Sequence, residues 1–346
     1  MNIHRQPTDV GRPRVLLAKF ICALLVAMGG IPVEHSGSAA SVALASTAAS
    51  PKAYVALHDE SAVAVLDTGT NQLLRTIPAA LGPHGLALTP DGRKVYVSSD
   101  EVSTVSVIDT TVDRIIGQIG VGATSYGLAI SPDGRQVLVS VWGADELVII
   151  DAATDRVIGR VTVSKPDRSA ISPDGRVAYV GSTSLDAPGL AIVDLKRHRE
   201  IGRVPLDHAP RALAFSPTGD RLYFTADGVD ALQVLDPRRN KIIAKVPAGV
   251  SPHGLMASTV RYELVAGASR DELEIVDPAR NLVSGSVPAG KRPYGIAIGS
   301  DGRTVYLANG GSNELSVIDL VDRKVTGTIS LGDAGYSPGE IVVQPR

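Results

Sequence analysis

Six side chains that could bind or act on an anion occur at one position of a recurring pattern, about 42 residues apart. They are His84, Tyr126, Arg168, Arg211, His253 and Tyr294. Guanidinium groups bind a carboxylate or phosphate with two parallel hydrogen bonds, and imidazole and phenol groups add further donors. An imidazole is also the most common general base, so His84 and His253 are candidate catalytic residues. The set predicts an anion site if the fold gathers it in one place.

The elements that would position these residues are revealed by an internal repeat. A short apolar segment ending in aspartate occurs seven times, and the intervals between the aspartates are 42, 42, 43, 42, 41 and 42 residues. The aspartates are Asp67, Asp109, Asp151, Asp194, Asp236, Asp277 and Asp319. A period of this length, with four strands per unit, is typical of a β-propeller blade. We therefore predict an all-β fold, a seven-bladed β-propeller with four antiparallel strands per blade.

Composition and turn chemistry agree with this prediction. The chain has 346 residues, of which 35 are Gly, 22 are Pro and 4% are aromatic, and such a composition favours short strands joined by many turns. The second unit shows strands at 85–89, 95–98, 104–109 and 115–119, with Thr89-Pro-Asp-Gly92 as its first turn. The equivalent segment 258–261 lacks both Pro and Gly, which predicts a looser turn. We interpret the seven aspartates as turn formers and not as catalytic acids, because they recur in every unit.

The ends of the repeat region predict how the fold closes. Residues 52–78 supply only three strands, and residues 339–345 supply an isolated fourth. The C-terminal strand should therefore complete the first blade, which pairs both free sheet edges. We expect residues 46–346 to form a single domain.

The second strand of most units carries a recognisable tyrosine motif. The copies are Tyr54-Val-Ala-Leu57, Tyr96-Val-Ser-Ser99, Tyr179-Val-Gly-Ser182, Tyr223-Phe-Thr-Ala226 and Tyr306-Leu-Ala-Asn309. This pattern resembles the YVTN-family β-propeller repeat, although Leu138 and Leu264 replace the tyrosine in two units. The resemblance implies an exported seven-bladed propeller. It does not imply one activity, since similar scaffolds serve as surface-layer modules, binders, lactonases, lyases and redox-enzyme domains.

A propeller would bring the six residues together around one channel mouth, since each lies just before or at the start of a first strand. Arg168 and Arg211 would be in neighbouring blades and would repel each other unless a ligand anion, Asp167 or Asp207 lay between them. The alternative interpretation is that the column fills the channel with ordered water and stacked rings. Trp142 is predicted to be a ligand contact in an exposed loop. The acidic loops around the mouth are either a solvated face or a field that attracts a cationic partner.

The N-terminal 45 residues are predicted to be a secretory signal peptide and linker. Basic residues precede an apolar run at 20–28, which is much shorter than a membrane span. Cleavage after Ala40 or after Ala45 fits the small-residue rule, and an uncleaved anchor is the alternative. The chain's one cysteine, Cys22, lies in this run, so we expect no disulfide and no thiolate site beyond it. The mature protein should be periplasmic or secreted.

Three classes of function remain open. The sequence favours an exported, non-catalytic binding or interaction propeller that binds a small anionic ligand or an envelope protein, as a monomer and without a cofactor. A lactonase or lyase would use His84 or His253 as base, with arginine stabilising an oxyanion. The third class is a periplasmic domain that docks to a redox partner. The net charge of −2 disfavours nucleic acid. We predict no metal site, because His58 could approach His84 but the pair lacks a third ligand.

Overall fold

The computed structural model describes residues 50–249, 252–257, 263–267, 271–331 and 338–345. These residues form 28 β-strands and one short 3-10 helix, which confirms the all-β prediction. They belong to a compact unit that spans Ala48–Arg346. The predicted signal peptide and the irregular turn at 258–261 lie outside the described residues. Within the described part of the chain, no helix has the length and apolar character needed to cross a bilayer.

The strands form seven four-stranded antiparallel sheets, which we call blades 1 to 7. Blade 1 contains β28 (Pro338–Val343), β1 (Lys52–Leu57), β2 (Ala62–Asp67) and β3 (Gln72–Pro78). Blade 2 contains β4 (Pro83–Leu88), β5 (Lys94–Ser99), β6 (Thr104–Asp109) and β7 (Arg114–Gly120). Blade 3 contains β8 (Ser125–Ile130), β9 (Gln136–Val141), β10 (Glu146–Asp151) and β11 (Arg156–Thr162), with helix η1 (Trp142–Ala144) after β9.

The remaining four blades repeat the same strand order. Blade 4 contains β12 (Pro166–Ile171), β13 (Val177–Ser182), β14 (Gly189–Asp194) and β15 (Arg199–Pro205). Blade 5 contains β16 (Pro210–Phe215), β17 (Leu222–Ala226), β18 (Val229–Asp236) and β19 (Lys241–Pro247). Blade 6 contains β20 (Pro252–Ala257), β21 (Glu263–Gly267), β22 (Glu272–Asp277) and β23 (Leu282–Pro288). Blade 7 contains β24 (Pro293–Ile298), β25 (Thr304–Asn309), β26 (Glu314–Asp319) and β27 (Lys324–Ser330).

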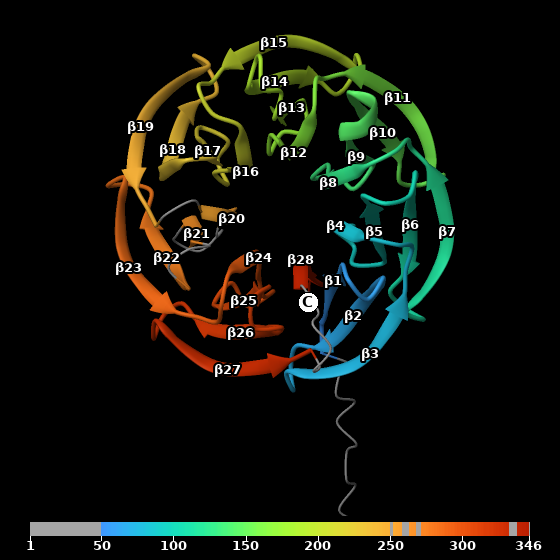
Figure 1. The fold of residues 1–346 in the computed structure, drawn as a ribbon, viewed down its shortest axis with the longest axis vertical. Coiled ribbons are helices and arrows are strands. Elements are labelled where there is room, and N and C mark those ends of the chain that lie inside the picture. The colour runs from blue at the N-terminus through green and yellow to red at the C-terminus, as the bar shows by residue number, and fades with distance from the viewer. Residues whose placement is uncertain (1–49, 250–251, 258–262, 268–270, 332–337, 346) are drawn as a thin grey trace, which may run out of the picture. The chain divides into compact units, whose positions relative to one another are not determined.

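The blades are arranged radially around a central opening, with the first strand of each blade innermost (Figure 1). Neighbouring inner strands contact each other in the cyclic order β4, β8, β12, β16, β20, β24, β28 and back to β4. The strand at the C-terminal end, β28, pairs antiparallel with β1, and a bulge separates Val55 from Leu57 in this pairing. The expected closing strand at 339–345 is thus shifted, since β28 begins at Pro338 and ends at Val343.

Apolar side chains between adjacent blades hold the radial arrangement together. Val105 and Val107 of blade 2, for example, pack in one buried cluster with Val137 and Val139 of blade 3. Each such side chain stabilises the fold by about 1.5 to 3 kcal/mol through burial. The outermost strand of a blade is buried on one side only, so its residues alternate between exposed and covered, as in β11.

The repeated aspartates act as turn formers, as predicted. The Oδ1 atom of Asp67, for example, accepts hydrogen bonds from the backbone N–H groups of Gly69 and Thr70, and the other six aspartates make equivalent bonds. In the first turn of blade 2, Gly92 has φ = 71°, which only glycine adopts without strain.

In the blades that carry it, the tyrosine of the second strand forms a connection to the next blade. The hydroxyl group of Tyr96 donates to Asp155, and that of Tyr54 donates to Asp113, at 2.6 and 2.7 Å. Both acceptors belong to the last turn of the following blade and have positive φ angles, a conformation that Asp and Asn tolerate. Burial and the nearby carboxylate raise the pKa of both tyrosines. The tyrosine is therefore a link between blades and not a site residue.

In the two blades that lack the tyrosine, the acceptor in the following blade is also absent. Leu138 replaces it in blade 3, and the turn position that would face it in blade 4 carries His198 instead of Asp or Asn. The ring of His198 instead lies against Gly159 of blade 3, where any larger residue would collide with it. In blade 6, Leu264 replaces the tyrosine. The equivalent turn position of blade 7 carries Arg323, which donates to the carbonyl oxygen of Ser284. At both of these boundaries, the donor tyrosine and the Asp or Asn that would accept its hydrogen bond are replaced together.

We predict that Tyr96→Phe lowers the free energy of unfolding by about 1.5 kcal/mol, because Asp155 loses a charge-assisted hydrogen bond. Urea denaturation measures this change. Tyr54→Phe serves as a second test at another blade boundary, and the two effects should add because the sites share no partner. A variant as stable as the parent chain would show that the hydroxyl groups do not link the blades.

Candidate functional site

The predicted column occupies the second position of five inner strands, with His84 in β4, Tyr126 in β8, Arg211 in β16, His253 in β20 and Tyr294 in β24. The prediction for blade 4 is wrong by one residue: Asp167 is second in β12 and Arg168 is third, because the loop before β12 is one residue shorter than the loop before β8. Small neighbours let the backbones come close there: a Cβ atom on Gly85 would collide with the carbonyl oxygen of Tyr126, and one on Gly127 with that of Asp167. Glycine after the column residue is therefore a packing requirement at these places. His84, Tyr126, Arg168, Arg211 and Tyr294 are described with their side chains, whereas the side chain of His253 lies outside the described residues.

Arg168 reaches across the channel and pairs with a carboxylate on the opposite side. Its Nη1 atom contacts Glu340 of β28, and its Nη2 donates to the Tyr294 hydroxyl at 3.2 Å. The guanidinium carbon also lies 5.6 Å from the centroid of the Tyr294 ring. Blades 1, 4 and 7 are thus joined through one guanidinium group. Glu340 is the third residue of β28, as Arg168 is of β12, and sequence reasoning missed it because the column was assigned to the preceding positions.

Arg211 also has carboxylate partners within the protein. It forms two parallel hydrogen bonds of 2.6 Å with Asp227 of its own blade, and its Nη1 lies 3.3 Å from Asp167 of blade 4. Burial raises the pKa of Asp167, while Arg168 and Arg211 oppose that shift. Asp167 therefore lies next to both arginines, and Asp227, which was expected to be solvated, adds a second counter-charge.

His84 is surrounded by rings and charges that keep it neutral. Its ring meets Tyr126 and Tyr294 edge to face, with centroid distances of 5.0 and 6.3 Å. Burial, and then the positive charge of Arg168, lower the pKa of His84 to about 3. The Nδ1 atom is buried and has no hydrogen-bond partner among the described residues. A base this weak is poorly matched to proton abstraction near neutral pH.

A second column surrounds the first and consists of the residue that directly follows the second strand of a blade. Its described members are His58, Asp100, Trp142, Thr183, Asp227 and Gly310. Trp142 is partly covered rather than fully exposed: its indole N–H donates to Thr183 at 3.1 Å, and its ring contacts Tyr126. The ammonium group of Lys165 lies 4.2 Å from the Trp142 ring centroid. Only the alignment of all repeats at the end of the second strand could have revealed this column.

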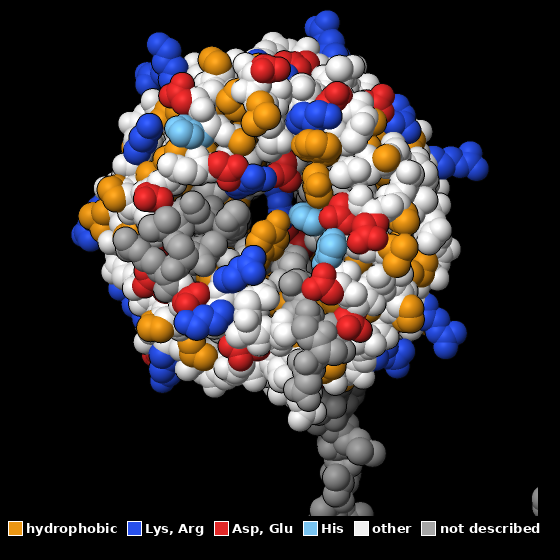
Figure 2. Space-filling model, in the orientation of Figure 1, with side chains coloured by type: hydrophobic (Ala, Val, Ile, Leu, Met, Phe, Trp, Pro, Cys, Tyr) orange, Lys and Arg blue, Asp and Glu red, His pale blue; other side chains and the backbone are white. Residues whose placement is uncertain are grey.

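Two cavities open at the mouth, and His84 and Tyr294 line both. One has a volume of about 410 Å³ and is also lined by Tyr126, Trp142 and Arg211. The other has a volume of about 450 Å³ and is bordered by His58, Asp100 and Arg292. On this face, basic, acidic and histidine side chains gather around the central opening (Figure 2).

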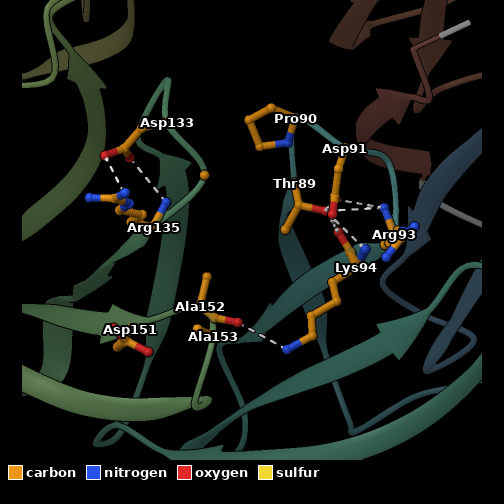
Figure 3. Close-up of a pocket in the computed structure, with 11 residues that line it drawn as sticks. Thr89, Pro90, Asp91, Arg93, Lys94, Asp133, Arg135, Asp151, Ala152 and Ala153 are labelled. Atoms are coloured by element: carbon orange, nitrogen blue, oxygen red, sulfur yellow. Dashed lines mark hydrogen bonds and ion pairs between the residues drawn. The ribbon is translucent and has the colours of Figure 1, made fainter.

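A larger cavity of about 670 Å³ lies on the opposite face, between the turns of blades 2 and 3 (Figure 3). Its polar groups already serve the local turns. Asp91 accepts from Thr89 and from the Arg93 backbone, and Lys94 donates to the Ala152 carbonyl oxygen and to Asp155. Because these polar groups are already bonded within and between the turns, we take the channel mouth, and not this cavity, as the candidate site.

Comparison with known proteins agrees with the fold. The sequence profile of a family described as YNCE-like beta-propeller matches residues 12–341, which supports the resemblance to YVTN-type repeats. No curated protein matches the sequence. Among solved structures, hydrazine synthase of Kuenenia stuttgartiensis has a TM-score of 0.71 at 20% identity, with 77% of this chain and 91% of that chain covered.

Two further structures have somewhat lower TM-scores. Dihydro-heme d1 dehydrogenase NirN, in complex with DHE, has a TM-score of 0.63 at 18% identity, over 82% of this chain and 64% of that chain. Apo AztD from Citrobacter koseri has a TM-score of 0.64 at 16% identity, over 85% and 97%. At these identities the similarity shows the fold alone.

We predict that His84 makes the fold less stable in mild acid. The unfolded chain binds a proton at His84 below about pH 6.5, whereas the native imidazole, with a pKa of about 3, does not. Stability should therefore fall as the pH drops below 6.5, by at most about 1.4 kcal/mol per pH unit from this residue. His84→Asn should make this slope shallower in urea titrations at several pH values. An equal slope in His84→Asn and in the parent chain would contradict the prediction.

The pair across the channel gives a separate prediction. Glu340→Gln should lower the free energy of unfolding by about 1 to 2 kcal/mol, because Arg168 keeps its charge and loses its carboxylate partner. A double-mutant cycle with Arg168→Met, followed by thermal denaturation, measures the coupling. Strictly additive effects of the two substitutions would show that the contact contributes nothing.

Proposed function

Because the chain belongs to the YNCE-like beta-propeller family, we propose that it is an exported, non-catalytic binding protein whose channel mouth holds a small organic ligand. The observation that carries this proposal is the pair of cavities at the mouth, with aromatic and charged side chains converging between them. Pockets of this size that combine apolar walls with converging polar groups are typical ligand sites. The signal-like N-terminal 45 residues support export.

The walls of the 410 Å³ cavity favour a flat, ring-bearing ligand. Tyr126 and Trp142 meet edge to face, so the cavity is bordered by aromatic surfaces against which a ring can pack. Leu185, at the edge of the same cavity, is 98% exposed and gains burial when a ligand covers it.

The charges in this cavity restrict the polar part of the ligand. Arg211 is the cation that lines it, and Asp167 and Asp227 already neutralise that cation. A ligand carboxylate or carbonyl group must therefore share Arg211 with Asp227, which is itself partly exposed. A free inorganic anion lacks the apolar surface that would offset this competition, so a ring with one acceptor group fits better than the simple anion expected from the sequence.

The state of His84 argues against catalysis by this residue, which is the candidate base whose side chain the structure describes. The alternative lactonase or lyase reaction requires a base with a pKa near the working pH, and the burial of His84 lowers its pKa to about 3. Arg168 is held by Glu340 and Tyr294, so it is not free to stabilise an oxyanion without breaking that pair. These two facts support a binding role for the mouth.

The proposal can be tested with Trp142, which is the one tryptophan of the chain and borders the cavity. We predict that a ring-bearing carboxylate from a panel such as benzoate, indole-3-acetate and nicotinate changes its fluorescence in a saturable way. Arg211→Gln should weaken this binding at least about 10-fold, since it removes the donor for the acceptor group.

Arg203→Gln is the matched control, because Arg203 pairs with Glu200 on β15, away from the mouth. It should leave the affinity unchanged. No fluorescence change and no thermal shift with any member of the panel would contradict a small-ligand site and favour a protein partner at this face.

A further inference from the structure

We propose that His58, Asp100 and Glu101 form a binding site for a divalent transition-metal ion at the boundary between blades 1 and 2. One ligand atom from each residue lies within 4.8 Å of the others. The Nε2 atom of His58 is 3.1 Å from both carboxylate oxygens of Asp100. The sequence prediction of no metal site considered His58 only with His84 and did not include the two acidic residues of the next blade.

The donor set is chemically suited to such an ion. One imidazole nitrogen and two carboxylates are ligands that Zn²⁺ and Mn²⁺ accept, with bond lengths of about 2.0 to 2.2 Å. Ligand atoms at that distance from a common ion lie roughly 3 to 3.5 Å apart, which is the separation of His58 Nε2 from Asp100. The exposed Glu101 side chain needs only a small adjustment to complete the set.

The surrounding backbone holds the carboxylates in position. Gly82 has φ = 61°, and a Cβ atom there would collide with the Asp100 carboxylate and lie 2.9 Å from Cγ of Glu101. The Asp100 N–H also donates to the Gly82 carbonyl oxygen at 3.1 Å. On the other side of the site, Asp59 lies 3.2 Å from His58 Nδ1 and orients the ring, as partners behind metal-binding histidines do.

The site opens into the cavity of about 450 Å³, which His58 and Asp100 line together with Tyr294 and Arg292. Three protein ligands leave at least one coordination position for water or a ligand in that cavity. The other described members of the second column are Trp142, Thr183, Asp227 and Gly310, and none of them is a histidine. Among the described members, a histidine next to a carboxylate therefore occurs at one blade boundary. The site does not depend on whether the mouth binds an organic ligand.

Titration of the metal-free chain with Zn²⁺ and with Mn²⁺ in a calorimeter tests the proposal. We expect saturable binding of an ion that His58→Ala and Asp100→Asn each weaken at least about 10-fold. Glu101→Gln, at an exposed position that cannot disturb the core, should weaken it in the same direction. Co²⁺ gives an independent signal, because its visible absorption should appear with the parent chain and disappear in His58→Ala.

Two control variants separate this site from adventitious binding. Glu60→Gln removes a negative charge from the same loop, and His208→Asn removes an exposed histidine from another blade; neither should change the affinity. All variants keep the remaining histidines, so the differences report the substituted residue alone. Equal affinity in the parent chain and His58→Ala, or the absence of saturable binding, would overturn the proposal and leave His58 and Asp100 as a hydrogen-bonded pair.

Discussion

The convergence of the inner strands on one axis is the constraint on which the rest of the structure depends. Side chains at the second and third positions of these strands share a narrow space, so any charge there must find a counter-charge nearby. Arg168 does so with Glu340 across the channel, and Arg211 with Asp227 and Asp167 beside it. A guanidinium without a counter-charge in such a partly covered space would destabilise the fold. These ion pairs therefore connect the inner strands and also neutralise the arginines that a ligand at the mouth would meet.

This constraint explains what the sequence could and could not predict. The repeat period depends only on local strand and turn chemistry, so the strand order and the turn-forming role of aspartates such as Asp67 were predictable from the residues. The places of His84, Tyr126, Arg211 and Tyr294 were predictable as well, because equivalent repeat positions have equivalent places around an axis. Arg168 was assigned one residue too early, because three residues separate β11 from β12 where four separate β7 from β8. The pairing between blades was not predictable, since the period gives the direction of a side chain and not how far it reaches.

Glu340 and Trp142 illustrate that limit. Glu340 lies outside the repeating column position, and its contact with Arg168 joins residues 172 positions apart in the sequence. Trp142 was expected in an open loop, yet a turn of 3-10 helix places its indole N–H against Thr183. The carboxylates also change the expected ligand. A basic mouth would attract small anions, whereas arginines that are already neutralised favour a ligand with apolar surface and one acceptor group.

The pairing of β28 with β1 has a consequence for how the chain reaches this structure. The backbone N–H of Lys52 bonds with the side chain of Gln344, which lies 292 residues later. Until that distant segment is synthesised, the edge of β1 has no partner and the circle of blades stays open. Contacts of such long sequence separation form slowly, and a chain that lacks the C-terminal segment would expose the edge of β1 to pairing with other chains.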